Sequence, residues 1–246
     1  MRSVPAATAA LRVLRFLSAR ATPAPAARIA ADLGLPRSSA YHLLRAMAAE
    51  GFVVHYPEER TWGIGVAAWE VGQGFSRQEP LARLARVPLA RLVDAAGLSG
   101  HLAVLHGTDV LYLIEERARG SDRLVSDVGV RLPAHLTASG RAILAGLTPA
   151  QVRALYPSAA GLVQRTGRGP TTLRELGTVL AVTQRLGHAV EDSEVTEGFA
   201  SLAVRVAAEP TPAAVALTWR SVLDVDPGAL LARLAATAAE IEARLR

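Results

Sequence analysis

The stretch that decides the fold is PRSSAYHLLRAMAAE, residues Pro36–Glu50. The face opposite its apolar side chains carries two arginines, two serines, a tyrosine and a histidine, and has no acidic residue before Glu50. Pro36 suits the first turn of a helix, and Gly51 is a natural helix end. The stretch therefore predicts an amphipathic helix, because at helical spacing four apolar side chains share one face: Ala40, Leu43, Leu44 and Met47.

The neighbouring segments place this helix in a larger unit. A shorter amphipathic segment, Pro25–Leu33, precedes it across the tight turn Gly34-Leu35, as in helix-turn-helix units. Two strand-like runs, 52–55 and 61–64, follow it around the polar turn 57–60 and predict a hairpin. With a first helix at Thr8–Ser18 and a loop over 19–25, this is the element order of a winged helix.

The exposed face of the central helix suits the major groove of DNA. Guanidinium groups reach guanine or phosphate, and hydroxyls near a helix N-terminus reach phosphates. An ordinary solvated helix face has a similar composition, so the helix alone leaves both interpretations open. The predicted DNA contacts are Arg28, Pro36, Arg37, Ser38, Ser39, Tyr41, His42, Arg45 and, at the tip of the wing, Arg60 beside two glutamates.

Composition limits the function classes. The chain has 246 residues, half of them hydrophobic, which is enough for two packed domains. The net charge of +5 allows a polyanionic partner without requiring one. There is no cysteine, which excludes disulfides, thiolate nucleophiles and cysteine-based metal sites. No uncharged apolar run reaches the length of a membrane span, so we expect a soluble cytoplasmic protein.

The remainder of the chain predicts an α+β sensor-like domain. Val66–Phe75 is expected to be a connecting helix that ends near Gly74, with the domain boundary at about 76. The helices that follow are predicted at Leu81–Ala96, Thr137–Leu147, Pro149–Leu155, Leu173–Leu186 and Pro227–Arg246. Strands are predicted at His101–His106, Val110–Arg117, Leu124–Val130, His188–Glu191, Ser201–Val206 and Ala213–Trp219.

Four segments in this order resemble the IclR family of bacterial transcriptional regulators: Ala26–Ser39, Arg131–His135, Ser139–Leu144 and Gly187–Gly198. The resemblance implies a winged helix-turn-helix at 1–65, a linker helix at 66–76 and a GAF-like effector-binding domain at 77–246. It also implies a sequence-specific regulator that binds palindromic operators as a homodimer or dimer of dimers. A small-molecule effector would act by favouring one state of the effector domain.

The resemblance also implies where the effector binds, between the sheet and the loop that opens the helix after Leu-Pro-x-His. This chain departs from the family at Thr218–Val222, where Arg220 replaces a serine. Arg220 would clamp a carboxylate, pair with Glu191 or face solvent, and these alternatives stay open. We hypothesise that the effector is a small organic acid, bound by His135, Ala138, Ser139, Glu191, Ser201, Thr218 and Arg220.

Other motifs predict no catalytic residue, cofactor or metal. Gly63–Ala68 matches a dinucleotide fingerprint but follows a wing hairpin instead of opening a βαβ unit. His101 and His106 point to opposite faces of one strand, and there is no nucleophile elbow. The better alternative function is a DNA-binding regulator without a small-molecule ligand, its pocket self-filled or gated by a protein partner. A small-molecule-processing enzyme is the weaker one.

Overall fold

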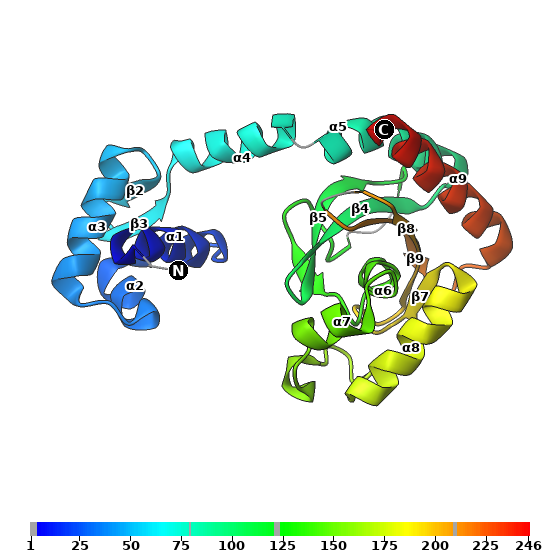
Figure 1. The fold of residues 1–246 in the computed structure, drawn as a ribbon. Helices are drawn as coiled ribbons and strands as arrows, with labels where there is room; N and C mark the ends of the chain where they lie inside the picture. The colour runs from blue at the N-terminus through cyan, green and yellow to red at the C-terminus, as the bar shows by residue number, and fades with distance from the viewer. Residues whose placement is uncertain (1–3, 79, 121–123, 209–210) are drawn as a thin grey trace. The chain divides into compact units, whose positions relative to one another are not determined.

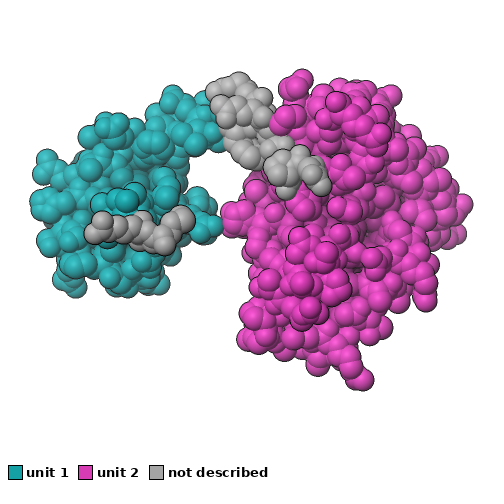
Figure 2. All heavy atoms as spheres, in the orientation of Figure 1, with its two compact units in different colours: residues 1–78 teal, residues 79–246 magenta. Residues whose placement is uncertain are grey.

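A computed structural model of the chain describes residues 4–78, 80–120, 124–208 and 211–246. It divides into two compact units, Met1–Gln78 and Glu79–Arg246 (Figure 1, Figure 2). Within the described residues, no helix combines the length and the hydrophobicity that crossing a membrane requires.

The smaller unit is the winged helix-turn-helix that the sequence predicts. Its helices pack around a core in which Val13, Ile29 and Leu44 are fully buried. A three-stranded antiparallel sheet in the order β1-β3-β2 forms the wing. The elements are α1 (Pro5–Ser18), β1 (Ala24–Pro25), α2 (Ala26–Leu33), α3 (Arg37–Ala49), β2 (Val53–Tyr56), β3 (Thr61–Ile64) and α4 (Val66–Gln78).

Two glycines fix the chain path in this unit. Gly34 ends α2 in the left-handed conformation, with φ of 65°, which a residue without a Cβ adopts at little cost. Gly65 lies where the wing meets α4, and a Cβ there would stand 2.2 Å from the carbonyl oxygen of Gly51. The close approach of these two backbone segments therefore requires glycine at position 65.

Three local predictions for this unit were wrong. Pro36 is the N-cap of α3, not part of its first turn, because its ψ of 139° is extended. The linker helix α4 continues past Gly74 to Gln78, since glycine inside a helix weakens it without ending it. The loop predicted over 19–25 contains β1, whose two residues pair with Thr61 and Trp62.

The larger unit is built on a six-stranded antiparallel sheet in the order β6-β5-β4-β9-β8-β7. Its strands are β4 (Ser99–His106), β5 (Asp109–Glu116), β6 (Arg131–Pro133), β7 (Ala189–Asp192), β8 (Phe199–Val206) and β9 (Ala213–Arg220). Its helices are α5 (Pro80–Ala96), α6 (Ala138–Leu144), α7 (Pro149–Leu155), α8 (Leu173–Leu186) and α9 (Pro227–Leu245), with a 3₁₀ turn at Ala159–Gly161.

The sheet has a different helical layer on each face. Helices α5 and α9 cover one face through a core that includes Leu89, Leu102 and Leu234. The other face curls around α6, with α8 packed outside it, through a core that includes Ile143 and Leu176 (Figure 1). This arrangement confirms the α+β fold and leaves the start of α6 facing the polar side chains of the sheet.

A bulge in β5 sets which side chains reach that face. Leu102 pairs with Ile114 and Ala103 pairs with Tyr112, so Leu113 is an extra residue in β5. Tyr112 and Glu115 consequently face the α6 side of the sheet, although an uninterrupted strand would send them to opposite sides. The alternation of apolar and polar residues along the sequence of β5 does not predict this bulge.

The predicted strand at Leu124–Val130 was wrong, because only Arg131–Pro133 forms a strand in this region. Gly129, with φ of 85°, and Val130 make single hydrogen bonds to Tyr112, and a turn at 127–130 bends the chain. The preceding residues instead close over the α6 face of the sheet. Helix α6 also ends at Leu144, earlier than predicted, while Thr137 caps its start by accepting a 2.9 Å hydrogen bond from the amide of Gly140.

Candidate DNA-binding and effector sites

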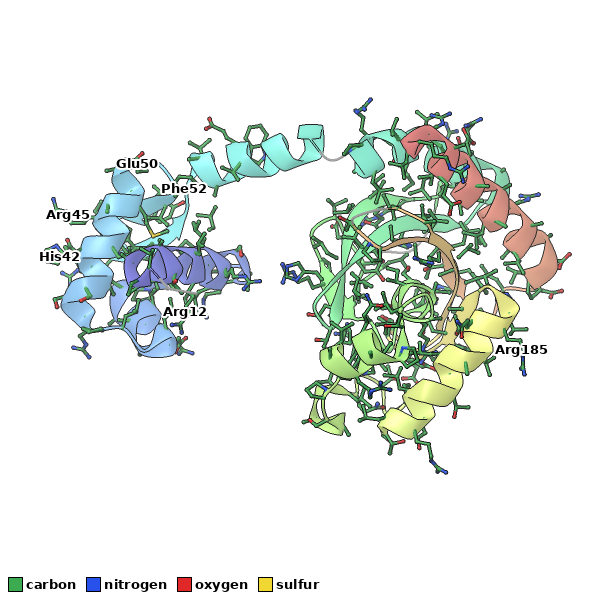
Figure 3. The ribbon with its side chains drawn as sticks, in the orientation of Figure 1. Arg12, His42, Arg45, Glu50, Phe52 and Arg185 are labelled. Carbon is green, nitrogen blue, oxygen red and sulfur yellow. The ribbon has the colours of Figure 1, made fainter. Side chains whose placement is uncertain are left out.

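Helix α3 presents all six of its predicted contacts to solvent. Arg37, Ser38, Ser39, Tyr41, His42 and Arg45 are exposed, while Ala40, Leu44 and Met47 anchor the opposite face in the core. Figure 3 shows His42 and Arg45 pointing away from the body of the unit. The helix therefore offers one continuous polar and basic face, which we call the recognition face.

Aromatic rings join the recognition face to the wing. Trp62 on β3 is buried, and its ring meets that of Tyr41 edge-on at 6.2 Å. The ring of His55 on β2 lies 4.4 Å from Trp62 on the same strand pair. Helix and wing are thus packed as one body, and not joined by the backbone alone.

The other two predicted arginine contacts stand in different environments. Arg28 forms a 2.7 Å ion pair with Asp32 one turn along α2, which offsets part of its charge. Arg60 is exposed at the tip of the wing in the left-handed conformation, with φ of 53°. Arg60 follows Glu58 and Glu59, so the wing tip is not strongly basic.

In the larger unit, a cavity that is partly open to solvent lies between the sheet and the start of α6; we call it the effector cavity. Apolar walls come from residues such as Leu132, Val195 and Phe199. Hydroxyl groups supply most of its polar lining: Tyr112, Ser126, Thr137, Ser139, Thr196, Ser201 and Thr218.

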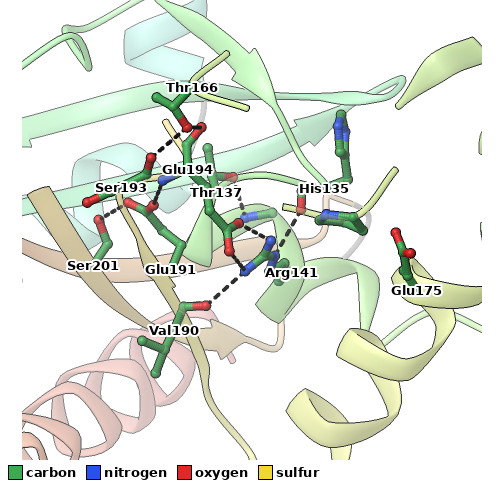
Figure 4. Close-up of polar contacts among 12 residues, drawn as sticks. His135, Thr137, Arg141, Thr166, Glu175, Val190, Glu191, Ser193, Glu194 and Ser201 are labelled. Atoms are coloured by element: carbon green, nitrogen blue, oxygen red, sulfur yellow. Dashed lines mark hydrogen bonds and ion pairs between the residues drawn. The ribbon is translucent and has the colours of Figure 1, made fainter. Parts of the chain in front are cut away.

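Glu191 is the acidic group of this cavity, and it is buried on β7. Its carboxylate accepts hydrogen bonds from the Ser201 hydroxyl at 2.9 Å and from the amide of Glu194 at 3.2 Å (Figure 4). Ser201 in turn lies 2.9 Å from the hydroxyl of Thr218. Burial raises the pKa of Glu191 to about 7, although these hydrogen bonds favour the ionised form.

His101 on β4 forms the far wall of the cavity. Its Nε2 lies 2.8 Å from the Ser126 hydroxyl and 3.9 Å from a carboxylate oxygen of Glu115. Burial, together with the smaller effect of the charge of Arg117, lowers the pKa of His101 to about 4, so the ring is neutral at pH 7. A serine, a histidine and an acid thus meet, but serine and acid approach the same ring nitrogen, whereas a catalytic triad uses both nitrogens.

The loop after β7 closes one side of the cavity and is held in place by contacts with α6. Thr196 in this loop lines the cavity, and among the described residues its buried hydroxyl has no hydrogen-bond partner. Buried Arg141 on α6 pairs with Glu194 and donates to the carbonyls of His135, at 2.9 Å, and Val190, at 3.1 Å (Figure 4). The ion pair therefore ties the loop to the helix.

The structure brings five of the seven predicted effector residues together, since the lining includes Ala138, Ser139, Glu191, Ser201 and Thr218. His135 is wholly buried outside the lining, where its Nε2 lies 2.9 Å from the carbonyl of Val163. Its ring packs edge-on against Tyr156, so the structure does not bring His135 into the lining of the effector cavity.

Arg220 also lies outside the lining of this cavity. The side chain is exposed, and its guanidinium sits over the ring of Phe199, 5.5 Å from the ring centre. The carboxylate of Glu191 is occupied by Ser201 and the Glu194 amide, and Arg220 lines a neighbouring cavity. Of the three alternatives for Arg220, this position argues against a role in filling the effector cavity.

Sequence reasoning missed most of the other lining residues, and four of these are instructive. His101 and Tyr112 sit on strands whose faces were not assigned, and the β5 bulge hides the pairing that brings them together. Thr196 and Phe199 lie in and after the loop that follows β7. The available signal was His101, an ionisable residue next to the apolar run Leu102–Leu105. Among the described residues, no group of three or more acidic, histidine or cysteine side chains is placed to hold a metal.

Both units of the chain match known protein families. A family model for the C-terminal domain of the bacterial transcriptional regulator IclR matches residues 75–243, and a model for the IclR helix-turn-helix domain matches residues 6–57. The glycerol operon regulatory protein of Streptomyces griseus is 31% identical over 205 residues, which are 83% of this chain and 80% of the relative. The transcriptional repressor IclR of Escherichia coli is 29% identical over 80% of this chain and 72% of its own length.

Solved structures share the fold over nearly the whole length. An IclR transcriptional regulator from Alicyclobacillus acidocaldarius matches with a TM-score of 0.85 at 23% identity and covers 100% of both chains. An IclR homologue from Microbacterium hydrocarbonoxydans, solved in complex with 4-hydroxybenzoate, matches with a TM-score of 0.81 at 22% identity. It covers 98% of this chain and 99% of its own.

Proposed function

The chain belongs to the IclR family of bacterial transcriptional regulators, and from this we propose that it senses a small organic acid in the effector cavity. It is a DNA-binding regulator with a helix-turn-helix domain and an effector-binding C-terminal domain. We place it in the cytoplasm, where the chromosome lies. The observation that carries the acid proposal is a hydroxyl-lined cavity whose Thr196 hydroxyl has no partner among the described residues.

A carboxylate suits this lining. Hydroxyl groups donate to carboxylate oxygens, and Ser139 and Thr196 face the same cavity. The amides of Ala138 and Ser139, at the start of α6, have no acceptor among the described residues and add two donors. Glu191, with its pKa raised to about 7, is protonated in part of the population at neutral pH and can then share a proton with a ligand oxygen. The structural relative bound to 4-hydroxybenzoate supplies one acid to test.

We propose a sensing role for the cavity in preference to a catalytic one. Ser126 and Glu115 approach the same nitrogen of His101, so these three groups do not form a relay in which the serine and the acid use different ring nitrogens. With its pKa lowered to about 4, His101 is also a weak base at neutral pH.

We infer that α3 enters the major groove of a palindromic operator. The contacts we propose are Arg37, Ser38, Ser39, Tyr41, His42 and Arg45 on the recognition face, with Pro36 at its start, Arg28 on α2 and Arg60 on the wing. Two copies are needed to read a palindrome, and Val66, Trp69 and Val71 leave α4 with large exposed apolar side chains. We propose that these contribute to a homodimer, which further association would turn into a dimer of dimers.

The experiment that tests this function uses the purified full-length chain and genomic DNA fragments that it selects. The logarithm of the DNA-binding constant should fall linearly with the logarithm of the salt concentration, because phosphate contacts release counterions. Adding 4-hydroxybenzoate or another acid of a small panel should change the affinity of the complex. If the chain binds DNA, but no acid changes the affinity for DNA or binds the chain in calorimetry, the ligand-independent alternative is correct. If the chain binds no selected DNA fragment, the enzyme alternative is favoured.

A further inference from the structure

A groove lies between α7 and α8, with the end of α6 at its floor; we call it the α7–α8 groove (Figure 1). No described residue lines both this groove and the effector cavity. The groove is partly open to solvent and holds a volume of about 340 Å³, within the roughly 300–1,000 Å³ of small-molecule sites. Its size therefore suits a small molecule.

The floor of the groove is apolar. Leu144, Leu176 and Leu180 are buried there as part of the core of the larger unit. The ring of Tyr156 lies beside them, and its hydroxyl already donates a 3.1 Å hydrogen bond to the carbonyl of Thr108. The floor consequently needs no further hydrogen bond, and an apolar molecule that displaced water from it would be stabilised by the hydrophobic effect.

A glycine leaves space in one wall of the groove. Gly177 stands inside helix α8, where glycine is one of the least favourable residues. A Cβ at this position would meet no atom within 4 Å, so packing within the chain does not require glycine here. The absent side chain instead keeps the groove wide between α7 and α8.

The rim of the groove carries one charge. Arg153 on α7 is the only charged side chain among the described lining residues, and Gln184 on α8 adds a neutral polar group. Arg153 is exposed, and within the described parts of the chain it takes part in no ion pair. An apolar floor with a cation at its edge is complementary to a molecule that has an apolar body and one anionic head group.

We propose that the α7–α8 groove is a second ligand site, which binds an amphipathic monoanion such as a medium-chain carboxylate. The apolar chain lies on the leucine floor, and the carboxylate binds Arg153 at the rim. This site does not depend on the acid-sensing function proposed above.

The two sites share a helix. Leu144 and Ala145 at the end of α6 line the groove, while Ala138 and Ser139 at its start line the effector cavity. Because α6 has only seven residues, a ligand in the groove contacts the same short element as a ligand in the effector cavity. Any difference in how the two ligands position α6 would couple their affinities, and the coupling would be reciprocal.

Isothermal titration of the full-length chain with hexanoate, heptanoate and octanoate, beside 1-octanol and octylammonium, tests the proposal. Each added methylene should tighten binding about two- to fourfold until the floor is covered. Octanoate should bind about 2- to 5-fold more tightly than octanol, as for an exposed ion pair, and octylammonium should bind least. Arg153→Gln should remove the preference for octanoate. Arg185→Gln removes the same charge from the exposed face of α8 and should leave the preference unchanged (Figure 3).

A second variant fills the groove. Gly177→Leu adds a side chain where there is open space, so the fold should be kept, as thermal unfolding would check. It should weaken octanoate binding about tenfold, which corresponds to two methylene groups denied contact. Val182→Leu adds bulk to an exposed position of α8 outside the described lining of the groove and is the control.

Three results would overturn the second site. Binding of none of the octyl compounds would do so, as would octanoate binding that survives Gly177→Leu and is lost in Thr196→Val, which places the acid in the effector cavity. A change of oligomeric state in Gly177→Leu, measured by sedimentation, would show that a second copy of the chain covers the groove. Equal affinities for octanol and octanoate would overturn the anionic head group. None of these results bears on whether the effector cavity senses an acid.

Discussion

Ser201 donates a 2.9 Å hydrogen bond to Glu191 directly across the β7–β8 ladder, where the two residues are register partners. A hydroxyl has one proton, so the contact between Ser201 and Thr218 uses the proton of Thr218. Hydroxyl groups on β9 and β8 thus form a chain of hydrogen bonds that ends at the buried carboxyl group on β7. A ligand oxygen near Thr218 consequently meets a lone pair and not a proton.

Binding of a carboxylate ligand should weaken as the pH rises. With its pKa raised to about 7 by burial, Glu191 is mostly neutral at pH 6 and mostly charged at pH 8, where it repels an anion. We expect the affinity for the tightest acid of the panel to fall about tenfold over this range, which follows from the protonated fraction. Calorimetry at pH 6, 7 and 8 measures it, and Glu191→Gln should show a flat profile.

Stability should depend on pH through two groups of opposite sign. The pKa of Glu191 lies above the ordinary value of 4.5, so its contribution to stability is fully present below pH 4.5 and is lost as pH rises to about 7. Glu191→Gln should therefore raise the free energy of unfolding at pH 8 relative to pH 4.5 by up to about 3 kcal/mol. Urea unfolding at both pH values checks this, and an equal effect at both would contradict it.

His101 should act in the opposite direction. Its pKa is lowered from 6.5 to about 4, so its contribution is present above pH 6.5 and is lost as pH falls toward 4. Between pH 4.5 and 6.5 the two slopes cancel in the natural chain. In the Glu191→Gln variant the free energy of unfolding should therefore rise with pH between pH 4.5 and 6.5. Adding His101→Gln should remove this rise.

Thr196→Val should stabilise the free protein and weaken its ligand. The substitution keeps the shape of the side chain and removes a buried hydroxyl that has no partner among the described residues. Relief of that burial should add up to about 1 kcal/mol of stability, while a lost ligand hydrogen bond should cost about 2- to 10-fold in affinity. Thr178→Val on the exposed face of α8 serves as the control. Unchanged affinity would remove Thr196 from the proposed site.

Gly65→Ala should destabilise the DNA-binding unit severely. The new Cβ would meet the Gly51 carbonyl at 2.2 Å, and backbone cannot move aside as a side chain does. We expect a loss of about 2 kcal/mol or more, at the upper end of overpacking costs, with loss of DNA binding. Gly72→Ala in α4, where a Cβ meets nothing within 4 Å, should instead stabilise the helix by up to about 1 kcal/mol. Thermal unfolding compares the two.

Removing Arg45 should weaken DNA binding more than removing Arg28. Arg45 is exposed on the recognition face, whereas Arg28 already pairs with Asp32. A phosphate contact by Arg45 would lower the salt slope of binding by about one, and a base contact would cost about 1–3 kcal/mol at one operator position. Arg12→Ala on α1 removes the same charge and is the control (Figure 3). Equal losses for all three would assign the effect to net charge alone.

The parts of the fold that sequence predicts are those set by neighbours along the chain. The apolar spacing of α3, the turn at Gly34 and the capping threonine at 137 act within a few residues, so their pattern is visible in the sequence. The ion pair of Arg141 with Glu194 joins residues 53 positions apart, and no local rule predicts it. The same holds for His101 and Tyr112, which meet only after the sheet has formed.

The extra residue in β5 has an evolutionary consequence. Leu113 has no partner in the ladder, so deleting it would straighten β5 and leave Tyr112 and Glu115 two positions apart, still on the same side of the sheet. A regular β5 of unchanged length would instead turn one of them toward the apolar layer under α5 and α9. Lineages of this regulator that lack the bulge should therefore have a β5 that is one residue shorter.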